Sequence, residues 1–238
     1  MQRIRERHRH MGGRKLYQML QPFFLEHQIK MGRDGLFDLL QSNYLLVRRR
    51  RRKVFTTQSF HWLRKYPNII KELIPSGPNQ LWVSDITYWK VGPRYAYISL
   101  ITDAFSHKIV GYQLADSLAT VETIEALKMA LQNLPANHTG LIHHSDRGVQ
   151  YCSQEYVRML HDRCIQISMT ETGDPRDNAI AERVNGILKE EYLYDYSVTN
   201  LSQAKMVLDF VVGLYNQERP HMSCDYKTPT SVHENQIR

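Results

Sequence analysis

Three carboxylates in this chain lie at positions where a folded protein could bring them together. Asp85 is in the middle of a segment with the pattern of a strand, Asp146 directly follows a short apolar strand, and Glu182 is near the start of an amphipathic helix. Carboxylates that share one site raise each other's pKa, and hard divalent cations relieve their repulsion. Two such ions about 4 Å apart can activate an attacking oxygen and stabilise a leaving oxygen during displacement at phosphorus. These residues therefore indicate metal-dependent phosphoryl transfer.

The helix that carries Glu182 is predicted over residues 177–189 and has two distinct faces. Glycine and proline break the chain just before it, and Asp177 is a suitable N-cap. The residues of its polar stripe, spaced i, i+4, i+7 and i+11, are Asn178, Glu182, Asn185 and Lys189. Taken alone, such a stripe is usually a solvated surface. Beside two other carboxylates, it is better interpreted as one wall of a site.

Other residues that could bind a metal are weaker candidates. Asp103 follows the second predicted strand, where aspartate commonly stabilises a turn. His143 and His144 are adjacent in a strand, so one of them must face away from any common site. Mg²⁺ also disfavours imidazole ligands. We expect Asp103 to stabilise a turn, and the histidines to be structural or at most to support a site from behind.

The predicted elements follow the order of a mixed α/β fold. Three segments rich in β-branched and aromatic residues, at 81–89, 95–101 and 108–114, predict an antiparallel meander. The elements predicted after them are a helix at 120–133, a strand at 140–145, a helix at 153–162, a strand at 165–169, the Glu182 helix, and a last helix at about 201–216. This order predicts a ribonuclease-H-like fold, a mixed five-stranded sheet flanked by helices. In that layout the first and fourth strands are central neighbours, and the Glu182 helix packs across them.

The front of the chain is basic and is predicted to be helical. The net charge of +7 combines a strongly basic front with a mildly acidic remainder, as expected of a DNA-binding region joined to a carboxylate site. Short helices at about 16–24 and 33–43 are compatible with a helix-turn-helix-like unit. A further short helix is predicted around 61–71. We place a DNA-binding region with its linker in residues 1–75 and a catalytic core with a C-terminal helix in residues 76–238.

Six consecutive cations follow the second of these helices. They are Arg48, Arg49, Arg50, Arg51, Arg52 and Lys53. A block of like charges does not fold by itself and is often a solvated linker. With the basic helices before it, contact with the phosphates of DNA is the favoured interpretation.

The lack of long apolar runs argues against a membrane or secreted protein, and the cysteine spacing argues against a structural zinc site. No apolar run approaches the roughly 18 residues that a membrane-spanning helix needs, and the first residues lack the apolar core of a signal peptide. Cys152, Cys164 and Cys224 have no CxxC spacing, which indicates a reducing compartment and no structural zinc site.

Three blocks of this sequence resemble the signature blocks of the DDE transposases, which have a retroviral-integrase-type core. The blocks are 82–88, 144–151 and 177–182, and 35 residues separate Asp146 from Glu182, the interval that names the D,D(35)E group. More narrowly, the chain resembles the second-frame (OrfB) proteins of the bacterial insertion-sequence-three family. The segments that resemble this family's pre-core region and C-terminal ending are 11–16, 31–53, 215–221 and 227–229.

The resemblance implies a transposase that cleaves DNA at insertion-sequence ends and transfers the freed 3′-hydroxyl into target DNA. It implies two Mg²⁺ ions, replaceable by Mn²⁺, with Asp85 bridging them, Asp146 completing one site and Glu182 the other. Lys189 would contact DNA at the element end, Asn178 would line the approach, and Asn185 would lie on the same DNA-facing stripe.

The resemblance also implies partners and a location. The expected partners are double-stranded DNA of the element ends and the target, further copies of this chain on that DNA, and the upstream-frame (OrfA) protein. That protein is expected because the chain begins shortly before the pre-core helices. The expected location is the bacterial cytoplasm, in association with the nucleoid and without a membrane partner.

Three other functions are weighed against this one. A non-catalytic, truncated DNA-binding product that regulates transposition would not need all three carboxylates. A retroviral-type integrase would carry an N-terminal zinc module with paired histidines and cysteines, but residues 1–75 contain no cysteine. A plain ribonuclease H is disfavoured by the arginine-rich front and by Lys189.

Overall fold

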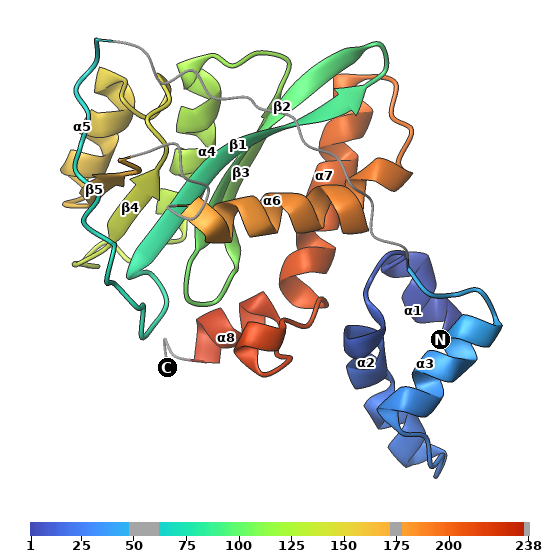
Figure 1. Cartoon of the computed structure of the whole chain (residues 1–238). Coiled ribbons are helices and arrows are strands. Elements are labelled where there is room, and N and C mark those ends of the chain that lie inside the picture. The colour runs from blue at the N-terminus through green and yellow to red at the C-terminus, as the bar shows by residue number, and fades with distance from the viewer. Residues whose placement is uncertain (48–61, 172–177, 236–238) are drawn as a thin grey trace.

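A computed structural model of the chain describes residues 1–47, 62–171 and 178–235 (Figure 1). Five strands form one mixed sheet in the order β3-β2-β1-β4-β5. The strands are β1 (Leu81–Val91), β2 (Arg94–Asp103), β3 (Ile109–Ala115), β4 (Ile142–Ser145) and β5 (Gln166–Met169). The first three are antiparallel neighbours, whereas β4 runs parallel to both β1 and β5. The predicted fold, with the first and fourth strands adjacent at its centre, is confirmed.

Two pairs of helices cover the two faces of this sheet (Figure 1). The helices are α4 (Thr120–Gln132) and α5 (Gln154–Asp162) on one face, and α6 (Ala179–Glu191) and α7 (Leu201–Gln217) on the other. Each pair packs on its own apolar cluster, and β1 contributes to both. Trp82 of β1 belongs to the α4–α5 side and Trp89 to the α6–α7 side. This difference follows from the alternation of side chains along a strand.

The same alternation sets the side on which Asp85 lies. Leu81 and Val83 pack with Ala181 of α6, so the odd-numbered residues of β1 face that helix. In the parallel pairing, Val83 is opposite His144. Asp85 and Asp146 each lie two residues beyond this pair, and two residues restore the same face of a sheet. The topology therefore brings both aspartates toward the side that α6 covers.

The segment before β1 differs from its prediction. A short helix around 61–71 was expected, but residues 62–70 form no helix and the chain makes only a turn at 71–72. The Met169 amide donates to the Pro67 carbonyl at 3.3 Å, and the Ile69 amide donates to Ser168 Oγ at 3.1 Å. Pro67 explains the error, because the residue before a proline is biased away from helical dihedrals. The segment instead runs beside the edge strand β5.

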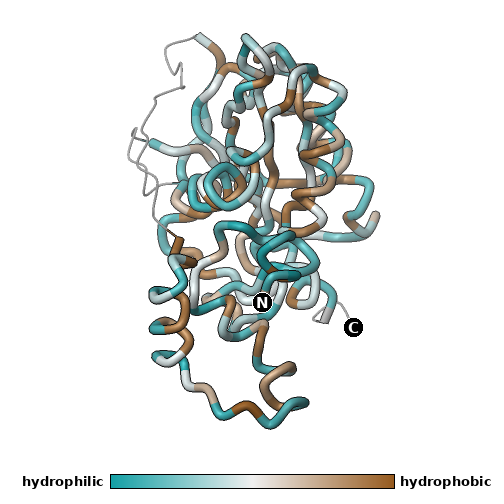
Figure 2. The backbone as a smooth tube through the Cα atoms, turned by 90° about the vertical axis from the view of Figure 1, so that its right-hand side faces the viewer, coloured by the Kyte–Doolittle hydropathy of each residue, from teal (hydrophilic) through white to brown (hydrophobic). Residues whose placement is uncertain are grey.

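The N-terminal helices form a unit with its own small core. They are α1 (Gln2–Arg7), α2 (Gly13–Glu26) and α3 (Arg33–Ser42). The buried residues shared by α2 and α3 are Leu16, Leu20, Phe24, Leu36 and Leu40. Figures 1 and 2 both show this unit beside the body that contains the sheet. The predicted helices at 16–24 and 33–43 are therefore present, whereas the run Arg48–Lys53 lies outside the described residues.

The last part of the chain continues beyond the predicted final helix. After α7 the structure has a short 3-10 turn, η3 (Met222–Cys224), and then α8 (Pro229–Asn235).

Within the described residues, no helix combines the length and the apolar character that crossing a bilayer requires.

The contact between β3 and α4 depends on a glycine. A Cβ on Gly111 would lie 2.2 Å from the Ala126 carbonyl oxygen and 3.0 Å from the Ala130 Cβ. Gly111→Ala should therefore lower the free energy of unfolding by about 1–3 kcal/mol, the usual cost of overpacking a core. Urea denaturation measures this change.

The matched control is Gly213→Ala in α7, where a Cβ would meet nothing within 4 Å. That variant should gain about 0.5–1 kcal/mol, because alanine is the better helix former. Equal stability of the two variants would show that α4 does not pack as closely on β3 as described.

Candidate active site

Asp85 is at the centre of the candidate site, because one contact joins it to α6. Asp85 pairs with Leu100 of β2 in the middle of the sheet, and its side chain is half-buried. Asn185 of α6 donates from Nδ2 to Asp85 Oδ2 at 2.6 Å. The Ile86 amide donates to the other oxygen, Oδ1, at 2.9 Å. The two bonds fix the carboxylate from the helix side and from its own strand.

Asp146 is held at the end of β4 by a tight turn. It is the first residue after the strand, and its Oδ1 accepts from the Gly148 amide at 2.9 Å. A Cβ on Gly148 would lie 2.9 Å from this same oxygen. The glycine therefore allows the backbone to approach the carboxylate closely and to orient it.

Glu182 lies in the first turn of α6 and is exposed. The predicted N-cap Asp177 lies outside the described residues, and Asn178 occupies the N-cap position. Among the residues that the structure describes, no group of three histidine, cysteine, aspartate or glutamate side chains is close enough together to hold a metal ion. That the three carboxylates form one metal site is thus a proposal.

Electrostatics nevertheless link the three carboxylates. The pKa of Asp85 is raised to about 7, first by burial and then by the charge of Asp146, with a smaller contribution from Glu182. The hydrogen bonds from Ile86 and Asn185 oppose this rise. Burial also raises the pKa of Glu182. Asp85 is therefore a carboxylate whose negative charge is disfavoured by its neighbours, as expected in a cation site.

The structure places Asn178 and Asn185 against β1. Asn178 Nδ2 donates to the Ser84 carbonyl at 2.9 Å, one residue before the Asp85 that Asn185 contacts. The two side chains are 8% and 4% exposed, and their Oδ1 atoms are buried with no hydrogen-bond partner among the residues that the structure describes. Nothing in the sequence distinguishes these asparagines from solvated ones, because their contacts arise only where α6 crosses the strand.

Lys189 approaches the site from the far half of α6. Its Nζ lies 4.8 Å from the centre of the Tyr88 ring, which makes a cation–π contact. Burial lowers the pKa of Lys189, and the negative charge of Asp85 opposes this effect. The ammonium group is therefore near enough to Asp85 for the two charges to interact.

The two histidines of β4 are fully buried and face serines. His143 Nε2 lies 2.7 Å from Ser84 Oγ and 2.9 Å from the Tyr156 hydroxyl, and His144 Nδ1 lies 2.9 Å from Ser168 Oγ. Burial lowers the pKa of His143 to about 3, so the ring is neutral. These contacts fit the expected structural role of the histidines.

Asp103 has the contacts of a turn-forming residue. It is fully buried and accepts from the amides of Asn79 and Ser106 at 2.7 and 2.8 Å. Burial raises its pKa, but the nearby His233 ring and the hydrogen bonds from Ser106 and Asn79 outweigh burial, so the net pKa is lowered. Its lone pairs are engaged within the protein, as predicted for a structural aspartate.

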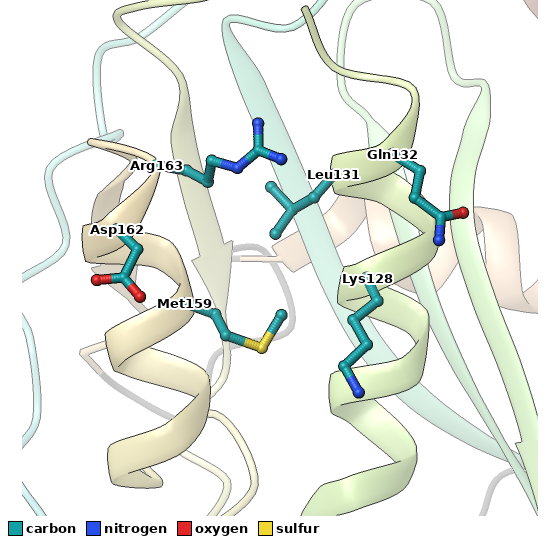
Figure 3. A pocket seen from close by; sticks show the side chains of 6 residues that line it. All are labelled: Lys128, Leu131, Gln132, Met159, Asp162 and Arg163. Carbon is teal, nitrogen blue, oxygen red and sulfur yellow. The ribbon is translucent and has the colours of Figure 1, made fainter. Parts of the chain in front are cut away.

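One pocket lies away from the carboxylates. It has a volume of about 330 Å³ between α4 and α5 (Figure 3). Its lining residues are Lys128, Leu131, Gln132, Met159, Asp162 and Arg163. This is the face of the sheet opposite α6, so the pocket is not part of the candidate site.

Comparison with known proteins decides the family. The profile described as "Integrase core domain" matches residues 75–175, and a second profile with that description matches residues 163–229. The chain is 35% identical over 219 residues to the insertion element IS600 uncharacterized 31 kDa protein of Shigella sonnei, covering 90% of this chain and 79% of that protein. It is 31% identical over 214 residues to the transposase for insertion sequence element IS629 of Shigella sonnei, with coverages of 90% and 70%. The chain belongs to the insertion-sequence-three family of DDE transposases.

Solved structures bear out the fold. The HTLV-2 integrase catalytic core domain, solved in complex with magnesium, matches with a TM-score of 0.52 and 23% identity, over 67% of this chain and 99% of that one. A chain of the simian T-cell lymphotropic virus intasome, solved in complex with PP2A regulatory subunit B56 gamma, matches with a TM-score of 0.58 and 20% identity, over 94% of this chain and 74% of that one. The transposase therefore has the ribonuclease-H-like fold of retroviral integrase cores.

The raised pKa of Asp85 predicts how stability depends on pH. A carboxyl whose folded pKa is about 7, against an ordinary value of 3.8, binds more protons when folded than when unfolded. Its contribution to the stability of the metal-free protein therefore falls as pH rises from about 4 to 7. Asp85→Asn should be more stable than wild type at pH 8 by about 1–4 kcal/mol, and the gap should shrink toward pH 4.

Urea denaturation in the presence of a chelator measures this gap at each pH. The control is Asp116→Asn, which removes an exposed carboxylate at the bend after β3 and should show no comparable difference from wild type at any pH. If the difference in free energy of unfolding between Asp85→Asn and wild type is constant across pH, this carboxyl is not forced toward its neutral form.

Proposed function

We propose that this transposase is a DDE-type polynucleotidyl transferase that cleaves DNA at the ends of an insertion sequence and joins those ends to target DNA. The observation that carries the proposal is Asp85, at the centre of β1, which Asn185 of α6 contacts at 2.6 Å and whose pKa is raised first by burial and then by the charges of Asp146 and Glu182. The three carboxylates come from the central strand β1, the end of its parallel neighbour β4, and the helix α6 that packs against β1. Family membership supports the same activity.

The chemistry of the donor set fits a hard divalent cation. All three candidate ligands are carboxylates, and like charges at close range favour a cation between them. We propose that Asp85, Asp146 and Glu182 hold two Mg²⁺ ions, with Asp85 shared and with Mn²⁺ able to substitute. When bound, such ions neutralise phosphate charge and activate the attacking oxygen. The magnesium complex of the related retroviral core supports this choice.

The chain's own residues then orient the site and meet the DNA. The Asn185 amide holds Asp85 in one rotamer, and Asn178 anchors the beginning of α6 to Ser84. For these two residues we now propose positioning of the site in place of the DNA contact predicted for them. Lys189 remains our candidate for a phosphate contact, because its ammonium group is close enough to Asp85 to interact with it.

We further propose double-stranded DNA, other copies of this chain and the upstream-frame protein as partners. A basic N-terminal unit beside a carboxylate site suits a substrate that extends over both. The retroviral relative in the intasome structure supports assembly into an oligomer on DNA. The proposed place of action is the bacterial cytoplasm, at the nucleoid.

The carboxylate proposal is tested with Glu182→Gln. The substitution keeps the shape of the side chain and removes its charge, so Mg²⁺-dependent strand cleavage and transfer on element-end DNA should fall at least 10³-fold, a loss of about 4 kcal/mol of transition-state stabilisation. The affinity for that DNA should change less than threefold. A gel assay of cleavage products and a filter-binding assay measure the two effects.

Glu190→Gln is the matched control, because Glu190 is an exposed glutamate on the same helix. It should keep wild-type activity. Full activity of Glu182→Gln would overturn the assignment, and a wild-type chain that binds DNA but never cleaves it, with or without the upstream-frame protein, would favour the non-catalytic regulator.

The arginine run is tested by replacing Arg48–Arg52 with glutamine. For every phosphate that these side chains no longer neutralise, the slope of log affinity against log salt concentration should decrease by about 0.9. Binding should therefore weaken about equally for element ends and for unrelated duplexes of the same length, as fluorescence anisotropy would show. A weakening confined to one sequence would indicate that these arginines read bases.

A further inference from the structure

The C-terminal segment 215–221, which resembles the family's ending, has no part in the carboxylate site. It begins in the last turns of α7 and contains one of the most deeply buried charges among the described residues, since Arg219 is 1% exposed. Tyr215 is also fully buried. A buried arginine is retained only where partners satisfy it, so this segment calls for an explanation.

Arg219 forms an ion pair with Glu191, the last residue of α6, which is the helix that carries Glu182. Its Nε and Nη2 donate to the two carboxylate oxygens of Glu191, each at 2.8 Å, and its Nη1 lies 2.9 Å from His221 Nε2. Burial raises the pKa of Glu191, but the hydrogen bond and charge of Arg219 outweigh burial and lower it. This bidentate pair fixes the far end of α6, about 20 Å from its beginning.

The N-terminal unit contacts the same end of α6. Lys15 Nζ lies 3.4 Å from Glu191 Oε1, and His8 Nδ1 lies 2.9 Å from the Tyr192 hydroxyl. Arg7 forms an ion pair with Glu218, the neighbour of Arg219, in which Arg7 Nε donates to Oε2 at 2.9 Å.

A further polar contact extends this interface beyond α6. His10 Nε2 lies 2.7 Å from Asp195 Oδ2, in the short 3-10 turn that follows the helix. Basic and histidine side chains from residues 7–15 thus meet acidic and phenolic side chains from residues 191–195 and 218.

We infer that Glu218 and Arg219 are positioning residues, which lock the basic N-terminal unit onto the end of the Glu182 helix. Arg219 holds the helix end and Glu218 holds Arg7, so one short segment joins the unit that binds DNA to the helix that completes the carboxylate site. One consequence rests on the proposed function: if the N-terminal unit binds DNA, that DNA lies at a fixed distance from Glu182. The docking itself is independent of that function.

The contact between the N-terminal unit and the end of α6 combines a buried ion pair with a partly exposed one. The Arg219–Glu191 pair is buried and bidentate, so breaking it would leave an unpaired buried charge. The Arg7–Glu218 pair is partly exposed, with side chains 53% and 32% exposed, so either residue can be changed without loss of packing in the core. Reversing charge at the exposed pair therefore disturbs docking while the fold remains intact.

The experiment measures the distance between the unit and the core by double electron–electron resonance on the full chain without DNA or metal. One spin label is placed on Cys164, which is exposed after α5, and one on Ser42→Cys at the end of α3, in a Cys224→Ser background. The starting protein should give one narrow distance distribution. Glu218→Arg should broaden it at least twofold, and the double reversal Arg7→Glu with Glu218→Arg should restore the narrow distribution.

A matched control reverses a charge outside the contact between the N-terminal unit and α6. Arg33→Glu, at the start of α3, removes an ion pair with Asp34 that is exposed on both sides and should leave the distribution unchanged. A narrow distribution that persists in Glu218→Arg, or one that the double reversal fails to restore, overturns the inference.

Strand transfer by the same variants separates docking from function. It should fall at least tenfold in Glu218→Arg and recover in the double reversal. If the distances respond as expected but the starting protein transfers no strands, the proposed function fails while the docking stands. Normal transfer by a Glu218→Arg variant with broadened distances would overturn the positioning role.

Discussion

The site depends on the way in which α6 crosses β1. The helix presents an apolar side that packs on the sheet. Two asparagine amides, Asn178 at its N-cap and Asn185 within it, reach consecutive residues of the strand, Ser84 and Asp85. These bonds define the position of α6 along β1, and with it the position of Glu182. The proposed carboxylate site therefore depends on this register.

The carboxylate site that we propose carries an energetic cost that the rest of the fold must offset. Asp85 is half-buried between like charges, and its raised pKa shows that ionisation there opposes folding. The apolar clusters on both faces of the sheet supply the opposing stabilisation, and the neutral His143 beneath the site adds no charge of its own. Such local conflict inside an otherwise consistent fold is typical of functional sites.

The helix that forms one wall of the site also links it to the basic front of the chain. Glu182 lies in its first turn and Glu191 at its last residue, where Arg219 and Lys15 meet. In this arrangement the helix is a rigid element between the carboxylates and the N-terminal unit. A transposase must coordinate binding of DNA with cleavage at a defined phosphate, and a rigid connection limits the relative motion of the two.

Local patterns in the sequence were sufficient for the element order and the central pairing of the first and fourth strands, because alternation and helical periodicity are local properties that burial enforces. The three carboxylates that the sequence predicts as one site remain a prediction. Local patterns were misleading at residues 62–70, where Pro67 and contact with β5 outweigh helix propensity. The contacts of Asn178, Asn185 and Arg219 follow from tertiary packing alone. A polar side chain at helical spacing looks the same in sequence whether it faces water, a strand or another helix, and its partner is set by packing between segments far apart in the chain.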